Sequence, residues 1–264
     1  MEGTIRMADD RLRCRILVLG LVLIAVAGAS SAGAQGLSGA ETAAINNLLG
    51  VGVLGAALQA SPIGNPASLI PLTPATWNFQ FASGPNQGAT ETDVLQASTQ
   101  PGAAAPWQYT AGTSTIYALD RAADGSIVSP SEQDLTQGVL TRYAPPRLVL
   151  APGMQPGAQT TTTLQVNVFN ISDPGTVTHT GSLTLIVTYL GRYQVTVPAG
   201  TYPAALVKWQ YDGQVGPATV SDVEYRFFVD GVGPVAAIDK QDVSAFLVYN
   251  NATKFGKVLV AKSQ

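Results

Sequence analysis

Cysteine and histidine are almost absent from this sequence of 264 residues, which contains one of each, Cys14 and His179. Zinc sites and intramolecular disulfides need several such side chains, so both are excluded. No motif typical of serine hydrolases, zinc proteases or calcium loops is present. A lone histidine can act as a general base, but His179 lies between threonines and is more typical of an ordinary residue at a sheet edge. The sequence therefore predicts no catalytic residue, no metal and no cofactor.

Charged residues are also scarce, at 12% of the chain, and the formal net charge is −3. No lysine or arginine occurs between Gln35 and Asp120. Nucleic acids and anionic membranes are bound through clusters of basic side chains. Because the sequence offers no such cluster, we expect no nucleic-acid partner.

A long hydrophobic run is missing as well. The apolar stretch at 16–27 has about 12 residues, fewer than the roughly 20 that a membrane-spanning helix needs. Arginines precede it and Ala32-Gly33-Ala34 follows it, a pattern typical of a cleaved export signal. Cys14 lies before the stretch, whereas a lipoprotein signal places its cysteine after it. Residues 1–34 are therefore predicted to be the signal peptide of an exported protein, periplasmic or extracellular, that keeps no integral membrane span after cleavage. A retained membrane anchor is the alternative.

Residues 35–69 are predicted to form a helix and a linker, followed by an antiparallel β domain at 70–264. The helix is expected from Ser38 to Gln59, where Ser38 and Glu41 fit a capping box and apolar residues cover most of the circumference. Such a helix must bury itself, either against the sheet or as an interfacial or oligomerising surface. A G-x-G-x-x-G pattern inside it lacks the preceding strand and the following carboxylate of a dinucleotide site.

Alternating apolar and polar residues predict antiparallel strands through most of the remaining chain. The pattern is clearest at Tyr189–Asp239, where it gives three strands separated by turns at Pro198–Gly200 and Asp212-Gly213. Residues 83–106 are predicted to be a long surface loop or flap. Further strands are expected at 76–82, 107–120, 126–128, 139–143, 148–150, 160–170 and 176–190, with a last hairpin of 245–249 and 254–260 that turns at Asn250-Asn251.

The predicted fold class is mainly β: an antiparallel sheet arranged as an open barrel or a sandwich, with one N-terminal helix after a signal peptide. A transmembrane barrel is disfavoured, because such barrels need strands of about ten residues. Several of the expected strands are shorter and are interrupted by prolines.

Several sequence segments resemble those of bacterial exported proteins of unassigned function. The resemblance rests on V-T-V-P-A-G-T-Y at Val195–Tyr202, G-V-G-P-V at Gly231–Val235, the proline-rich segment Pro145–Pro152, and the segments Ile70–Leu72 and Trp77–Phe79. Ala75 stands near the place where these proteins usually have glycine. The resemblance implies a β-rich domain, distantly like the open barrels of periplasmic lipoprotein carriers, and it implies no catalytic residues.

Four aromatic residues are the candidate ligand-binding residues: Trp209, Tyr211, Tyr225 and Phe227. They are expected to point the same way across a hairpin that turns at 212–218. They then form part of the core or, alternatively, line a cavity for an apolar ligand such as a lipid.

Two carboxylates, Asp222 and Glu224, share one face of a strand beside Arg226, about 7 Å apart as alternate strand residues. The simplest interpretation is a solvated strand face with a local ion pair. The function predicted overall is an exported, non-enzymatic envelope or secreted domain that binds an apolar ligand or a protein partner. A carboxylate-dependent hydrolase and a purely structural surface protein are the alternatives.

Overall fold

The protein is described by a computed structural model that covers residues 36–99, 103–245 and 249–263. The predicted signal peptide at 1–34 lies outside these residues. The described elements are α1 (Gly39–Leu49), β1 (Leu54–Leu58), α2 (Pro66–Leu69), β2 (Ala75–Ser83), β3 (Thr90–Ala97), β4 (Trp107–Ala111), β5 (Thr115–Arg121), β6 (Ile127–Asp134), β7 (Val139–Leu150), β8 (Gln159–Asn170), β9 (Asp173–Val197), β10 (Gly200–Val215), β11 (Ala218–Val229), β12 (Gly233–Ala245) and β13 (Tyr249–Ser263). Neither described helix is long and apolar enough to cross a membrane.

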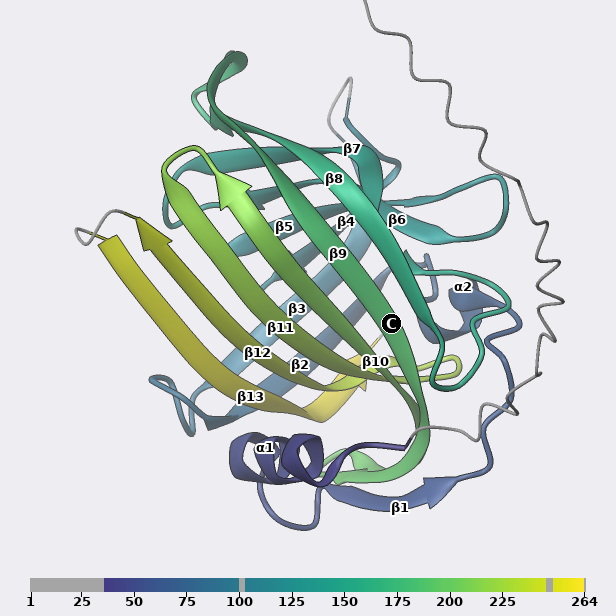
Figure 1. The fold of residues 1–264 in the computed structure, drawn as a ribbon. Coiled ribbons are helices and arrows are strands. Elements are labelled where there is room, and N and C mark those ends of the chain that lie inside the picture. The colour runs from purple at the N-terminus through teal and green to yellow at the C-terminus, as the bar shows by residue number, and fades with distance from the viewer. Residues whose placement is uncertain (1–35, 100–102, 246–248, 264) are drawn as a thin grey trace, which may run out of the picture. The chain divides into compact units, whose positions relative to one another are not determined.

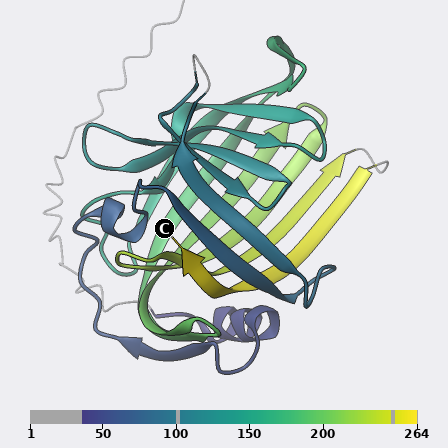
Figure 2. The same cartoon turned by 180° about the vertical axis from the view of Figure 1, so that it is seen from behind.

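The strands β2 to β13 form a closed antiparallel barrel (Figure 1). Each strand pairs with the next one along the chain, and β13 pairs with β2 to close the ring. Figure 2 shows this closure from behind, where the yellow β13 lies beside the blue β2. The short strand β1 extends the sheet outside the ring, with Leu54 opposite Val195 of β9. The predicted mainly β, antiparallel fold with one N-terminal helix is confirmed, and the barrel is closed.

The strand β9 shows how apolar alternation builds two faces of one sheet. Its residues Leu183, Leu185, Val187 and Tyr189 are buried in one hydrophobic cluster, as the alternation predicts. The register between β9 and β10 then shifts next to Gly191, whose φ of +114° favours glycine. Beyond this bulge the buried residues of β9 belong to a second cluster. The bulge therefore moves the apolar side chains of β9 from one cluster to the other.

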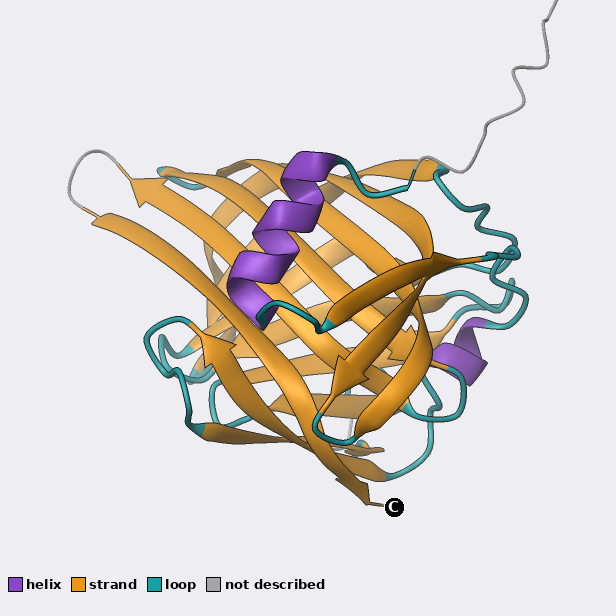
Figure 3. Ribbon diagram, turned by 90° about the horizontal axis from the view of Figure 1, so that it is seen from below, coloured by secondary structure: helices purple, strands orange, loops and turns teal. Residues whose placement is uncertain are grey.

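The helix α1 lies across the strands on the outer face of the barrel (Figure 3). Ser38 caps it, and Glu41 completes the predicted capping box. Glu41 also accepts a hydrogen bond from Lys208 at 2.8 Å, so the first turn is tied to β10. Packing is close at Gly256 of β13, where an added Cβ would lie 2.3 Å from the carbonyl oxygen of Leu48. Only glycine permits this approach of helix and strand.

The prediction of a helix over 38–59 is wrong for its second half. The helix ends at Leu49, because Gly50 follows with φ +97° and Gly52 has φ +94°. Residues 54–58 then form β1 and pair with β9. The glycines that fit poorly in a helix are thus the signal for its end.

Four other boundaries differ from the prediction. The predicted loop at 83–106 contains β3, and the predicted strand at 107–120 is the hairpin of β4 and β5. The expected short strands at 139–143 and 148–150 are one strand, β7, which continues through the intervening prolines. Asn250-Asn251 is paired within β13 and is not a turn.

The turn predicted at Asp212-Gly213 is also absent, because β10 continues to Val215. An added Cβ at Gly213 would lie 2.2 Å from the carbonyl oxygen of Ser182 on β9. This glycine therefore serves close strand contact rather than a turn.

Candidate functional site

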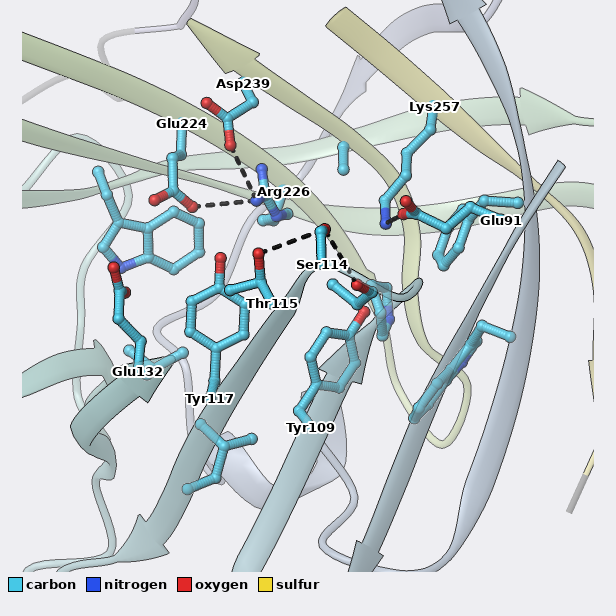
Figure 4. A pocket seen from close by; sticks show the side chains of 18 of the residues that line it. Glu91, Tyr109, Ser114, Thr115, Tyr117, Glu132, Glu224, Arg226, Asp239 and Lys257 are labelled. Carbon is cyan, nitrogen blue, oxygen red and sulfur yellow. Dashed lines mark hydrogen bonds and ion pairs between the residues drawn. The ribbon is translucent and has the colours of Figure 1, made fainter. Parts of the chain in front are cut away.

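The barrel interior holds a partly open cavity of about 300 Å³, whose walls come from β2 to β7 and from β10 to β13. Aromatic rings form much of the lining, including those of Tyr109, Tyr117, Trp209 and Tyr211. Charged side chains line the same cavity (Figure 4). They are five carboxylates (Glu91, Glu132, Asp134, Glu224 and Asp239) and three cations (Arg147, Arg226 and Lys257). The cavity therefore combines aromatic and apolar walls with charged groups, of which more are acidic than basic.

The four predicted aromatic residues do not share a face. Trp209 and Tyr211 line the cavity. Tyr225 and Phe227 lie on the opposite face, in the cluster that packs beneath α1. The reason is the two-residue connection between Val215 and Ala218, which places odd-numbered residues of β10 opposite even-numbered residues of β11.

The interior position opposite Trp209 is held by Glu224, and the one opposite Tyr211 by Asp222. The predicted pairing of these two carboxylates on one strand face is correct. Their predicted solvation is wrong, since the Glu224 side chain is 13% exposed and lines the cavity. Sequence alternation identifies which residues share a face of a strand, but it does not tell which face of the sheet is exposed to solvent.

Arg147 of β7 is buried in the cavity wall. Its Nη1 donates a hydrogen bond to the Tyr211 hydroxyl at 3.1 Å. The same nitrogen lies 3.6 Å from Glu132 and 3.9 Å from Glu224, distances too long for hydrogen bonds. The guanidinium carbon lies 5.0 Å from the ring centre of Tyr117, within the range of a cation–π contact. Its Nε is buried and has no hydrogen-bond partner.

Arg226 of β11 is held more completely. Its Nη2 lies 3.1 Å from Glu224 and 3.7 Å from Asp239. Its Nη1 donates to the carbonyl oxygens of Ile238 at 2.9 Å and Tyr225 at 3.2 Å. Backbone contacts therefore fix this guanidinium, and it joins two carboxylates from neighbouring strands.

Lys257 of β13 forms a third charged group where the barrel closes. Its Nζ donates to Glu91 at 2.5 Å and to Asp93 at 2.7 Å, and it lies 4.6 Å from the ring centre of Phe79. The hydroxyl of Tyr109 donates to the same oxygen of Asp93, Oδ2, at 2.5 Å. These contacts leave the lysine well paired, so the group stabilises the closing strands.

The surplus of acidic groups shifts the pKa of several carboxyls. Burial, followed by repulsion from Glu224, raises the pKa of Asp222 to about 9 and that of Asp239 to about 7. Burial also raises the pKa of Glu132, against the opposing effect of Arg147. One oxygen of Asp222 is buried without a hydrogen-bond partner. The interior therefore holds acidic groups that are compensated only in part.

Sequence reasoning missed Arg147, Glu132 and Lys257. A signal for two of them exists, because Arg147 and Lys257 interrupt apolar segments, P-P-R-L-V-L and F-G-K-V-L-V. A charged residue at an inward position of an apolar strand indicates a buried partner. In the part of the chain that the structure describes, no group of three or more acidic or imidazole side chains is arranged to hold a metal ion.

No protein-family model and no curated protein matches this sequence. Among solved structures, one similar chain is from Bacteroides fragilis NCTC 9343 and is named as an exported protein with a YmcC-like fold. It is 14% identical with a TM-score of 0.40, covering 78% of this chain and 100% of the other. Another, from Parabacteroides distasonis ATCC 8503, is named as a lipoprotein and is 11% identical with a TM-score of 0.34, with the same coverage. Both likenesses are too distant to assign an activity to this chain.

Proposed function

We propose that this protein is an exported binding protein that holds a small polar molecule inside its barrel. The observation that carries the proposal is the cavity inside the barrel, which is lined by charged groups that are incompletely paired. Ionised side chains are costly to bury unless partners compensate them. A barrel with a purely structural role is expected to fill its interior with apolar side chains. Export is supported by the signal-like pattern of residues 1–34.

The size and lining of the cavity argue against the apolar ligand expected from sequence. A volume of about 300 Å³ lies at the lower end of the range for small-molecule sites. An acyl chain would also have to lie against Glu224, Arg226 and Asp239, which would remain without water. We therefore favour a compact polar ligand that contacts the rings of Trp209 and Tyr211.

Native mass spectrometry of the protein purified from its own host tests this proposal. We expect a bound small molecule that is lost in Trp209→Leu, because that ring lines the cavity. The matched control is Trp107→Leu, since Trp107 is half-buried and does not line the same cavity. Retention of the ligand by both variants would place it elsewhere. A clean mass for the wild type, with no thermal stabilisation by any polar metabolite tried, would contradict the proposal.

A second candidate, a carboxylate-dependent hydrolase, is favoured by one specific observation. Asp239, with its pKa raised to about 7, lies opposite Glu224 in the cavity wall. A carboxyl with such a pKa is suited to general acid catalysis near neutral pH. The test is to incubate the identified ligand with wild type and with Asp239→Asn. Turnover by wild type that is lost in Asp239→Asn, with binding retained, would favour this candidate over simple binding.

A further inference from the structure

The hydrogen-bond and ion-pair partners of Arg147 all contact one nitrogen of its guanidinium group. The contacts to Tyr211, Glu132 and Glu224 are made by Nη1. On the opposite edge, Nε and Nη2 donate no hydrogen bond to the described residues, and Nε is buried. Nη2 is therefore the donor of this free edge that a ligand can reach, and its N–H groups can donate to a carboxylate.

An anion alone fits this site poorly. Glu132 and Glu224 lie 3.6 and 3.9 Å from Arg147, so an incoming carboxylate would meet two like charges. A cation alone fits no better, because it would meet Arg147 and Arg226 and would leave the free guanidinium edge without an acceptor. A ligand that carries both charges satisfies both requirements.

The cation of such a ligand has a clear place beside the two glutamates. Figure 4 shows Glu132, Glu224 and Tyr117 around the same part of the cavity. Tyr117 is paired with Glu132 across neighbouring strands, and Trp209 is paired with Glu224. An ammonium group there would be next to carboxylates and aromatic rings, both of which attract cations.

Resting on the proposed binding function, we propose that the cavity takes a small zwitterion whose carboxylate binds the free edge of Arg147 and whose ammonium binds Glu132 and Glu224. Free amino acids and their close relatives have this chemistry. The ligand keeps the total charge of the cavity unchanged, which a singly charged molecule would not do.

Thermal-shift screening with the twenty common amino acids and γ-aminobutyrate, followed by calorimetry on each binder, tests the inference. Each binder is compared with its amine-only and acid-only analogues, which lack the carboxylate or the ammonium. We expect the zwitterion to bind at least about 10-fold more tightly than either analogue, since each loses one charged hydrogen-bonded contact. Equal affinity for an analogue would overturn the inference.

Two variants separate recognition from folding. Arg147→Gln is expected to weaken the zwitterion by about 10- to 100-fold, whereas Arg142→Gln, an exposed arginine on the same strand, is not. Glu132→Gln is expected to weaken the binding of the zwitterion but to strengthen the binding of the acid-only analogue, because the negative charge of Glu132 that repels a carboxylate is removed. A folding defect in Glu132→Gln would weaken the binding of both ligands. Unchanged affinities, or equal losses of affinity for the zwitterion and the acid-only analogue, would therefore refute the assignment.

The outcomes also distinguish the two proposals. If native mass spectrometry finds a bound molecule but no zwitterion binds, the inference fails and the proposed binding function stands. If no molecule is found and none of the zwitterions or analogues binds, both proposals fail.

Discussion

Replacing Asp222 with asparagine is expected to stabilise the protein at neutral and alkaline pH. Asp222 lies on the interior face of β11, and burial together with Glu224 and Asp239 raises its pKa from 3.8 to about 9. At pH values between these two pKa values, Asp222 keeps its proton in the folded protein, whereas in the unfolded chain it has released it. The free energy of unfolding of the wild type must therefore fall as the pH rises from about 4 to 9. Asparagine removes this dependence because it has no proton to lose.

The size of the effect follows from the difference in pKa. At pH 7 the shift corresponds to ~4 kcal/mol, at about 1.36 kcal/mol per pH unit. Because Asp222 keeps some contact with solvent, we expect about half of this, ~2 kcal/mol, as the gain in Asp222→Asn at pH 7. Near pH 4 the variant and the wild type should be almost equal.

Urea unfolding at pH 4, 5.5, 7 and 8.5 measures this dependence. The control is Asp242→Asn, which changes an exposed carboxylate on the neighbouring strand β12. A wild-type stability that is flat from pH 4 to 8.5 would refute the reasoning. So would an Asp222→Asn variant that is less stable than wild type at pH 8.5.

Two further predictions concern the packing of α1 on the barrel. Partial burial raises the pKa of Glu41, but the hydrogen bond and charge of Lys208 together with the hydrogen bonds from Ser38 outweigh it and lower this pKa to about 2. The stabilisation by Glu41 is therefore present above pH 4.5 and is lost as the pH falls toward 2. The Glu41 side chain is 22% exposed in the wild type. In urea titrations, Glu41→Gln should lower the free energy of unfolding by about 1–2 kcal/mol at pH 7 and change it little at pH 2. An equal loss of stability at both pH values would contradict this. Gly256→Ala should destabilise the protein by about 1–3 kcal/mol because the new methyl group meets Leu48. Gly64→Ala should not, since no atom lies within 4 Å of the position of its new methyl group. Equal unfolding midpoints for the two variants would refute the close packing.

The sequence predicted the fold best where one face of a strand is apolar. The strands β9, β10 and β11 follow this rule and were recognised from alternation alone. The strand β3 was missed because Glu91 and Asp93 occupy its inward positions and conceal the alternation. Closure of the barrel could not be predicted, since it depends on pairing between β2 and β13, which are far apart in the chain.

The site was less predictable than the fold. The expected common face of Trp209 and Tyr225 depended on the position of a turn. The glycine of Asp212-Gly213 suggested a turn earlier than the real one, and the actual connection reverses the facing of every residue on β11 relative to that expectation. Arg147 was overlooked because a single charge in a strand gives no information about its partners on distant strands.

The order of the strands has a consequence for how the chain reaches its folded state. Every pairing in the ring joins consecutive strands except the closing one, which joins residues as far apart as Thr76 and Ser263. Local hairpins form quickly, whereas a contact of such high sequence separation forms slowly. Until it forms, β2 and β13 are open edges on which another chain could add a strand. Lys257 points inward from one of these edges, and inward-pointing charges discourage such association. The lysine that completes the barrel wall in the folded protein thus also protects the chain while the barrel is still open.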